Sequence, residues 1–347
     1  MSFRKEFPAL NSFTYFNTAY VGLMSQPLMD FRANCEKEYL YKGDQYKIDA
    51  YDRLDKTHET IARFIGSKKE QTFFVPNFSV GIRFVLDTLK KGSKVLYIKE
   101  DYHSLVDALE ERNFNLFSLS IEERLEEKIE ASLAEHHFDA LVVSMVQFTS
   151  GLKIDFNFLA SLHEKYPEML IIGDATQYIG TDFFSFSDSP FDAVVSSGYK
   201  WLLAGFGNGF VALSDRFMER NQPKSHTFYQ KVFAGHFNIL GADSLIFALD
   251  YLTQNNFKDL VEKNKMLSNT LREELTKIDW IPEYIDRADQ SSIVSVACQE
   301  QLLKRLEDQN IRAAYRGNYL RFSPHFYNST EEIDHLTSVL KGLKKTA

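Results

Sequence analysis

The stretch "VSSGYKWLLAGFGNGF" (residues 195–210) decides the fold. It continues a β-branched apolar run, "DAVVSSG" (192–198), and leads into Lys200 and a glycine-rich segment. Four more short apolar runs read as strands, at 94–99, 140–146, 169–175 and 209–214. Segments with helical spacing, such as 104–113 and 155–166, lie between the earlier runs. Strands alternating with helices predict the α/β class, with a mostly parallel sheet covered by helices on both faces.

The pattern changes after about residue 238. Two long amphipathic helices are expected at 240–254 and 257–278. A strand at 291–298, a helix at 299–309, a strand at 319–324 and a closing helix from residue 330 should follow. We therefore predict a large domain at 16–237 and a smaller α+β domain formed by 1–15 and 238–347. A chain of 347 residues is long enough for this division.

Charge and cysteine content narrow the classes of partner. The chain has 40 basic and 48 acidic residues, a net charge of -8, and no Lys/Arg block. These features disfavour nucleic acid and anionic membranes and favour a small molecule as the partner. The two cysteines, Cys35 and Cys298, exclude a disulfide framework, and no metal site is predicted. The N-terminus shows no signal-peptide pattern and the longest apolar run is short, so we expect a soluble, cytoplasmic protein.

Polar residues follow three of the predicted strands. They are Asp101, Tyr102 and His103, then Asp174 and Gln177, then Ser196, Ser197, Tyr199 and Lys200. Ligands of doubly wound sheets bind beyond the carboxyl ends of the strands, so we expect a site here. A buried lysine is a nucleophile toward carbonyl groups, and a buried aspartate needs a cation such as a protonated pyridine. Taken singly, Lys200 reads as a solvated lysine, Asp174 as a helix cap and His103 as a core histidine.

The segment "VPNFSVGIRFVLDTL" (75–89) reads as a strand end that enters an apolar helix near Ser79. Helix N-termini bind phosphate through free N–H groups, although an ordinary N-cap serine fits equally well. No Gly-Lys-Ser/Thr follows, so the turn is not a P-loop. The segment "GFGNG" follows the lysine and lacks the strand–GxGxxG–helix order. This disfavours an NAD-dependent oxidoreductase.

In this order, the residues resemble the class V aminotransferase family of pyridoxal-phosphate enzymes, which have fold type I. Lys200, the Asp174-x-x-Gln177 pair, His103 and the phosphate turn carry the resemblance. Segments 15–27, 235–252 and 319–336 are similar to further family motifs, so the resemblance covers nearly the whole chain. It lies nearest the isopenicillin-N-epimerase-like and cysteine-desulfurase-like branch.

The resemblance implies pyridoxal 5'-phosphate as the cofactor, held by Lys200 as a Schiff base. Asp174 would pair with the pyridinium nitrogen, Gln177 would bind the phenolic oxygen, and His103 would stack on the ring. The implied catalytic residues are Lys200, Asp174 and His103.

The resemblance also implies how the two anionic groups are bound. The phosphate would be held by Ser79 and the backbone at Phe78, with help from Ser197 and Tyr199. The implied substrate-binding residues are Arg321, for the carboxylate, and Asn17 and Ala19, at the mouth. His236 stands where relatives carry a threonine that reaches the partner's phosphate, so a homodimer with shared sites is expected.

Two departures from the family pattern bear on the reaction. The usual Gly-His-Lys is Gly-Tyr-Lys here, and the loop "NIRAAYRGN" (310–318) lacks the cysteine of cysteine desulfurases. Cys298 falls at the end of a predicted strand and reads as a structural thiol. We predict an aminotransferase acting on an amino acid or amino-carboxylate. The alternatives are a lyase or hydrolase of the kynureninase or cysteine-lyase kind, an epimerase, and a non-catalytic protein that keeps the fold for binding.

Overall fold

The computed structural model describes residues 3–221, 232 and 235–344. Its main sheet has seven strands in the order β2-β8-β7-β6-β5-β3-β4. Their bounds are β2 Thr72–Val75, β3 Lys94–Ile98, β4 Asn115–Leu119, β5 Ala140–Ser144, β6 Leu170–Asp174, β7 Ala193–Ser197 and β8 Gly209–Leu213. Strand β8 runs antiparallel to both of its neighbours, and the other pairings in the sheet are parallel. The predicted mostly parallel sheet is confirmed.

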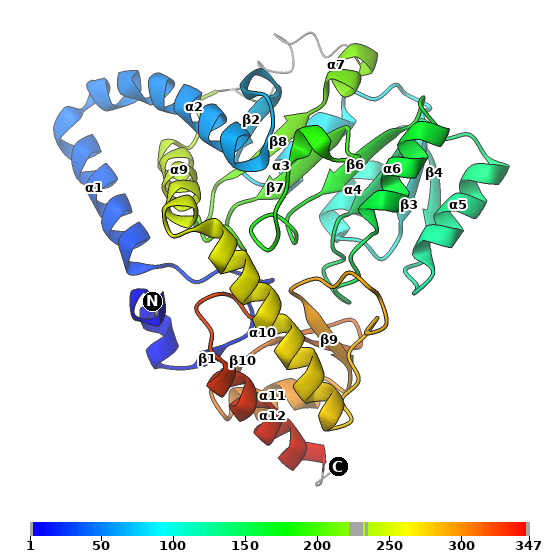
Figure 1. Cartoon of the computed structure of the whole chain (residues 1–347). Helices are drawn as coiled ribbons and strands as arrows, with labels where there is room; N and C mark the ends of the chain where they lie inside the picture. Colours follow the sequence, from blue (N-terminus) through cyan, green and yellow to red (C-terminus); the bar gives the residue numbers. More distant parts are fainter. Residues whose placement is uncertain (1–2, 222–231, 233–234, 345–347) are drawn as a thin grey trace.

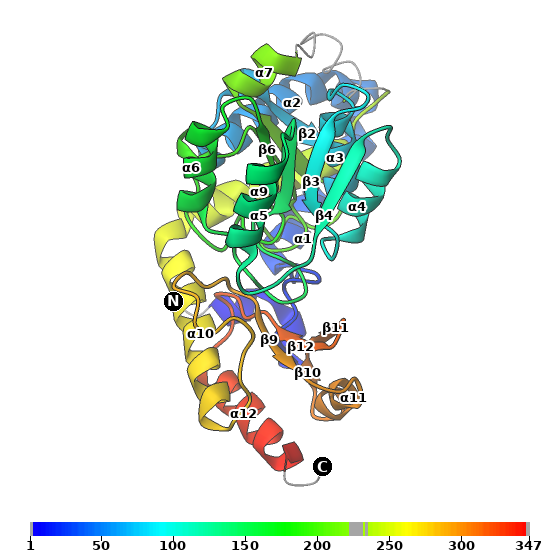
Figure 2. The same ribbon diagram turned by 90° about the vertical axis from the view of Figure 1, so that its right-hand side faces the viewer.

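Helices cover both faces of this sheet, as the two ribbon views show (Figures 1 and 2). Alternate strand residues such as Val95 and Leu96 enter different apolar clusters, because successive side chains point to opposite faces. One cluster includes residues of α3 (Phe78–Leu86), α4 (His103–Glu110) and α7 (Asp215–Asn221). The other includes residues of α2 (Asp44–Ile65), α5 (Leu125–Glu135), α6 (Phe156–Lys165) and α9 (Ile239–Gln254). The sheet is therefore buried on both faces, and its strand ends are where polar groups become accessible.

A smaller unit lies below the main sheet in Figure 1. It contains the antiparallel sheet β11-β12-β9 and three helices. Their bounds are β9 Val294–Ala297, β11 Ala314–Arg316, β12 Tyr319–Phe322, α10 Phe257–Lys277, α11 Gln301–Glu307 and α12 Thr330–Lys344. The N-terminal segment joins this unit, since β1 (Thr14–Tyr15) pairs in parallel with β10 (Ile311–Arg312). The N-terminal segment and the C-terminal part of the chain thus belong to the same smaller unit.

Helix α9 packs against α2 and against α1 (Gln26–Lys42), and against the core of the main sheet. Helix α10, by contrast, contributes Leu267, Leu271 and Leu275 to the core of the smaller unit. We therefore propose that the division between the domains falls between α9 and α10. Within the residues that the structure describes, no helix combines the length and the apolar character that crossing a bilayer requires.

Candidate functional site

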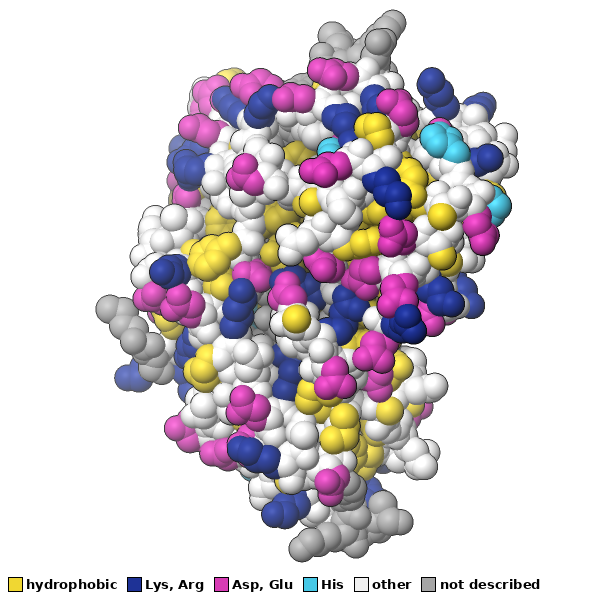
Figure 3. All heavy atoms as spheres, turned by 45° about the vertical axis from the view of Figure 1, so that its right-hand side comes forward, with side chains coloured by type: hydrophobic (Ala, Val, Ile, Leu, Met, Phe, Trp, Pro, Cys, Tyr) yellow, Lys and Arg dark blue, Asp and Glu magenta, His cyan; other side chains and the backbone are white. Residues whose placement is uncertain are grey.

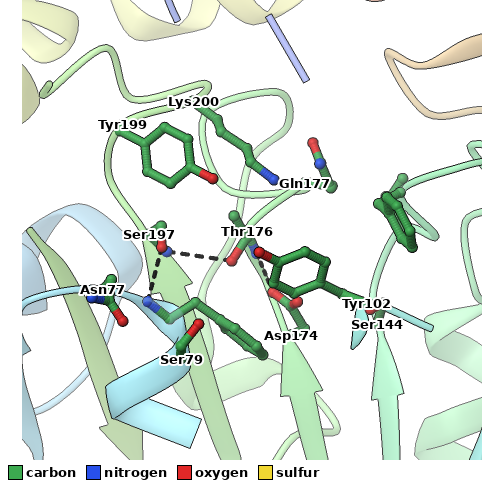
Figure 4. A pocket seen from close by; sticks show the side chains of 13 residues that line it. Asn77, Ser79, Tyr102, Ser144, Asp174, Thr176, Gln177, Ser197, Tyr199 and Lys200 are labelled. Atoms are coloured by element: carbon green, nitrogen blue, oxygen red, sulfur yellow. Dashed lines mark hydrogen bonds between the residues drawn. The ribbon is translucent and has the colours of Figure 1, made fainter. Parts of the chain in front are cut away.

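Four strand ends and one helix N-terminus meet at a single pocket (Figure 4). The strands are β3, β5, β6 and β7, and the helix is α3. Parallel neighbours end at the same edge of a sheet, which is why residues from distant parts of the chain converge there. The pocket is lined by Asn77, Phe78, Ser79, Tyr102, Ser144, Val146, Phe148, Asp174, Thr176, Gln177, Ser197, Tyr199 and Lys200.

Lys200 and Asp174 both line this pocket and are both buried, with exposed fractions of 8% and 6%. Burial lowers the pKa of Lys200 to about 8, although the carboxylate of Asp174 opposes that shift. Burial also raises the pKa of Asp174 to about 7, against hydrogen bonds from Thr176. One of these is donated by the backbone N–H of Thr176 at 2.8 Å. The site therefore holds an amine that loses its proton readily and a carboxylate that a nearby cation would stabilise.

A second buried carboxylate lies behind Asp174. Asp101 accepts hydrogen bonds from the backbone N–H of Ser144 at 2.9 Å, from the Ser144 hydroxyl at 2.5 Å, and from the backbone N–H of Tyr102 at 3.1 Å. Its negative charge adds to the rise in the pKa of Asp174, after burial. The two carboxylates make this end of the pocket electronegative, which suits a protonated ring nitrogen.

The opposite end of the pocket is formed by the first turn of α3. The side chain of Asn77 accepts from the backbone N–H of Val80 at 2.9 Å and begins the helix. The hydroxyl of Ser197 accepts from the backbone N–H of Phe78 at 2.8 Å, which ties β7 to the helix start. The hydroxyl of Ser79 lies on the same turn and accepts from Ser104 at 2.7 Å. A helix N-terminus with hydroxyl groups beside it is a suitable site for a phosphate.

The aromatic wall of the pocket is Tyr102, the residue before His103. The Lys200 amine nitrogen lies 5.7 Å from the centroid of the Tyr102 ring, which packs edge-on against Phe78 and Phe148. His103 begins α4, is exposed, and is not among the residues lining the pocket. The structure thus places Tyr102, rather than the predicted His103, in the wall of the pocket.

On the substrate side, Arg321 is almost fully buried on β12. One guanidinium nitrogen donates to the carbonyl of Phe148, while Nε and Nη2 have no hydrogen-bond partner within the described residues. Burial lowers the pKa of Arg321 well below its usual range, and the charge of Arg316 lowers it further. A buried guanidinium with an open edge is suited to a bidentate carboxylate.

Gln177 connects the segment after β1 to the pocket. Its amide donates to the carbonyl of Ala19 at 2.9 Å and accepts from the indole of Trp201 at 2.8 Å. Ala19 and Asn17 also contact Ser323, two residues after Arg321, so both predicted mouth residues lie close to that strand. His236 lies elsewhere, exposed, in a hollow formed by α1, α2 and the start of α9.

The sequence comparison identifies the family. Residues 23–336 match the model for aminotransferase class-V. The chain belongs to the class-V aminotransferase family. Among its relatives, an uncharacterized aminotransferase of Bacillus subtilis is 19% identical and covers 96% of this chain and 95% of the relative. A probable cysteine desulfurase of Methanothermobacter thermautotrophicus is 20% identical, with 98% and 97% covered.

Solved structures of a cysteine desulfurase and of the cystine C–S lyase C-DES share the fold. A cysteine desulfurase from Thermococcus onnurineus in its apo form superposes with a TM-score of 0.81 at 19% identity, covering 99% of this chain and 98% of that one. The lyase C-DES, in a variant with glycine covalently linked to its pyridoxal-phosphate cofactor, gives a TM-score of 0.85 at 15% identity, with 97% and 98% covered. The predicted fold type I architecture is confirmed.

The class-V family depends on pyridoxal phosphate, and the pocket fits this cofactor. The electronegative end with Asp174 suits the ring nitrogen, the α3 end suits the phosphate, and Lys200 lies where it can bond the aldehyde. Pyridoxal phosphate is therefore the cofactor of this class-V enzyme.

Several lining residues were not predicted from the sequence. Asn77, Ser144, Thr176 and Phe148 lie in the pocket, and only the tertiary structure brings them there. Thr176 accepts from the backbone N–H of Ser197 at 3.3 Å and so joins β6 to β7. The sequence did hold one signal for Thr176, which stands two residues after Asp174 at the end of a buried strand. Neither cysteine lines the pocket: Cys35 is on α1, and burial raises the pKa of the half-buried Cys298.

Proposed function

We propose that this enzyme is an aminotransferase of α-amino acids. The supporting observation is that buried Lys200 has Asp174 as a counter-charge, while the open guanidinium edge of Arg321 can bind an α-carboxylate. The name of the Bacillus subtilis relative, an aminotransferase, agrees with this proposal. A site that brings these three residues together does not favour a non-catalytic binding protein.

The chain's own groups would divide the chemistry as follows. When bound, pyridoxal phosphate supplies an aldehyde for the substrate amine and a ring that stabilises negative charge at Cα. Asp174 would keep the ring nitrogen protonated, because the ionised carboxylate is stabilised by that cation. Neutral Lys200, with its lowered pKa, would take the proton from Cα at Nζ and move it as general acid and base. Arg321 would orient the substrate through its carboxylate.

We further propose roles for the residues around these groups. Gln177, held by Ala19 and Trp201, would bind the phenolic oxygen through its amide. Ser79, Ser197 and the backbone of Phe78 would bind the phosphate, with Tyr199 beside them. Asn17 and Ala19 would line the substrate mouth.

A panel of amino acids separates aminotransferase from lyase activity. The purified holoenzyme is incubated with each amino acid, with and without an acceptor 2-oxo acid, and 2-oxo acid, ammonia and sulfide are measured. An aminotransferase forms the new 2-oxo acid only when the acceptor is present, and Lys200→Ala abolishes this. Ammonia or sulfide released without acceptor would instead establish a lyase, as the name of the cystine C–S lyase C-DES suggests. Inversion at Cα without either product would establish an epimerase.

We also propose a homodimer formed through α1 and α2. These helices expose a set of large apolar side chains: Met29, Tyr39, Leu40, Tyr41, Ile48 and Tyr51. His236 lies beside Tyr51, with ring centroids 5.9 Å apart, so this patch would carry His236 toward the partner's phosphate. Sedimentation should give twice the chain mass of 40.2 kDa. Leu40→Asp should shift the protein toward monomer, whereas Ile281→Asp, at an exposed position outside the patch, should not.

Two cysteines that form no disulfide fit a reducing compartment, and we propose the cytoplasm.

A further inference from the structure

Two arginines share one face of the small antiparallel sheet. In the pairing of β11 with β12, Ala314 lies opposite Arg321 and Arg316 lies opposite Tyr319. Directly opposed residues share a face, as do residues two apart along a strand. Arg316 and Arg321 are therefore diagonal neighbours, about 7–8 Å apart at the backbone. A substrate held by one guanidinium lies within reach of the other.

This face of the sheet is turned toward the pocket. Arg321 donates to the carbonyl of Phe148, which lines the pocket. Ser295, opposite Arg321 on β9, donates to the carbonyl of Thr149 at 2.7 Å. On the other side, the guanidinium carbon of Arg316 lies 5.1 Å from the centroid of the Tyr20 ring, next to the mouth residue Ala19. Arg316 thus lies at the rim of the pocket mouth.

The two guanidinium groups form a positive region beside Lys200, and among the described residues no ion pair joins either of them to an acidic side chain. The charge of Arg316 lowers the pKa of Arg321 and of Lys200, in both cases after burial. Among the described residues, the hydrogen bond that Arg316 donates goes to the backbone carbonyl of Tyr315, at 3.0 Å. An α-carboxylate on Arg321 would compensate one of these charges and leave the other.

We propose that Arg316 is a specificity-determining residue that binds a second carboxylate on the substrate, so that the enzyme acts on dicarboxylic amino acids. The inference rests on the proposed function, because it takes Arg321 as the site of the α-carboxylate. A planar guanidinium favours carboxylate over neutral side chains through paired hydrogen bonds. The stacked Tyr20 ring holds Arg316 in place and shields one face of its guanidinium.

Binding of unreactive acids to the holoenzyme tests this directly. Glutarate and valerate have the same number of carbons but two carboxylates and one, and their affinities are measured from the change in cofactor absorbance. The wild-type protein should bind glutarate at least about tenfold more tightly than valerate. Arg316→Gln should reduce this preference to within about twofold, while Arg316→Lys should keep part of it. Arg312→Gln is the matched control, because Arg312, on β10 just before β11 in the sequence, stacks on Phe13 and pairs with Glu307 of α11 at 3.9 Å.

Steady-state kinetics provide a second readout. Arg316→Gln should raise the KM for aspartate or glutamate at least about tenfold and leave the KM for alanine unchanged, whereas Arg321→Gln should raise both. Equal binding of glutarate and valerate by the wild-type holoenzyme, or an unchanged preference in a folded Arg316→Gln protein, would overturn the inference while leaving the aminotransferase proposal standing. If no amino acid is transaminated but glutarate is still preferred through Arg316, the proposed function fails and the second carboxylate site remains.

Discussion

At the scale of single residues, the site depends on groups whose burial opposes their charge. Asp174 and Lys200 are both displaced from their ordinary pKa values chiefly by burial, in directions that favour the neutral form of each. Burying this pair destabilises the protein without its cofactor. It favours binding of the cofactor, because a protonated ring nitrogen stabilises the ionised carboxylate.

Asp174→Asn is expected to separate stability from function. The folded-state pKa of Asp174 is raised to about 7, so its contribution to stability is present below about pH 4 and lost as pH rises toward 7. The cofactor-free variant should therefore become increasingly more stable than the wild type as the pH rises between these values. Its affinity for pyridoxal phosphate and its turnover should fall. Denaturant unfolding at pH 4.5 and pH 7.5 measures the first effect, and a difference that does not change with pH would contradict it.

The neighbouring residues Tyr102 and His103 are expected to respond differently to truncation. Tyr102→Ala should weaken cofactor binding about tenfold, because it removes an aromatic contact worth roughly 1 kcal/mol or more. Tyr102→Phe should keep most of the affinity, and His103→Ala should leave it unchanged because His103 is exposed outside the pocket lining. Titration of the apo form with cofactor, followed by absorbance, checks all three. An equal loss in His103→Ala would return the stacking role to His103.

At the scale of elements, α3 contributes both packing and an anion-binding end. Its apolar face is buried against β7 and β8, while its first turn opens into the pocket. Gly81 makes this packing possible, since a Cβ at that position would lie 2.7 Å from a methyl carbon of Val195. The helix start is therefore fixed by the same contacts that bury its body.

Substitutions of the cap residue Asn77 should distinguish these two roles. Asn77→Ala removes the hydrogen bond to the Val80 N–H and should lower the free energy of unfolding by about 1 kcal/mol. Asn77→Asp keeps the cap and the stability, but it should weaken cofactor binding because a carboxylate repels the phosphate. Asn77→Ser should retain both properties. Thermal unfolding and cofactor titration are the two measurements, and unchanged cofactor affinity in Asn77→Asp would place the phosphate elsewhere.

At the scale of the whole molecule, the loop before β9 holds the two units together. Arg287 pairs with Glu126 of α5 and donates to the carbonyls of Glu123 and Lys153. Buried Lys153 pairs with Asp182 at 3.1 Å and with Asp289 of the loop at 2.6 Å. Figure 3 shows the molecule turned by 45° from the view of Figure 1. Basic and acidic side chains are intermingled on this face.

Breaking this connection should affect stability and substrate binding together. Arg287→Ala removes charge-assisted hydrogen bonds from a half-buried position and should lower the free energy of unfolding by about 2 kcal/mol. It should also raise the KM of the substrate, because Arg321 lies on the unit that is released. Arg124→Ala is the control, since its pair with Glu127 is mostly exposed and should contribute little to stability. Denaturant unfolding and steady-state kinetics are measured for both variants. Equal changes in unfolding free energy and in KM for the two variants would contradict the prediction.

Some elements of the fold could be predicted from the sequence and others could not. The central strands β3, β5, β6, β7 and β8 were predicted because both of their faces are buried, which leaves continuous apolar runs. Strand β4 was missed because it is a half-exposed edge strand with the mixed sequence NLFSL. The placement of α9 also escaped prediction, since an apolar helix does not specify which of two cores it will join.

The sequence by itself predicted the sheet and placed Lys200 and Asp174 at strand ends, because burial leaves a local record in the chain, whereas Arg321 was implied by the resemblance to the family. Only the tertiary structure decided that Tyr102 rather than His103 faces the pocket, because one residue of rotation at a helix start is invisible in a linear pattern. It also decided that Asp101 lies behind Asp174 and that Arg316 shares a face with Arg321. Those relations depend on strand register, which forms only when distant segments pair.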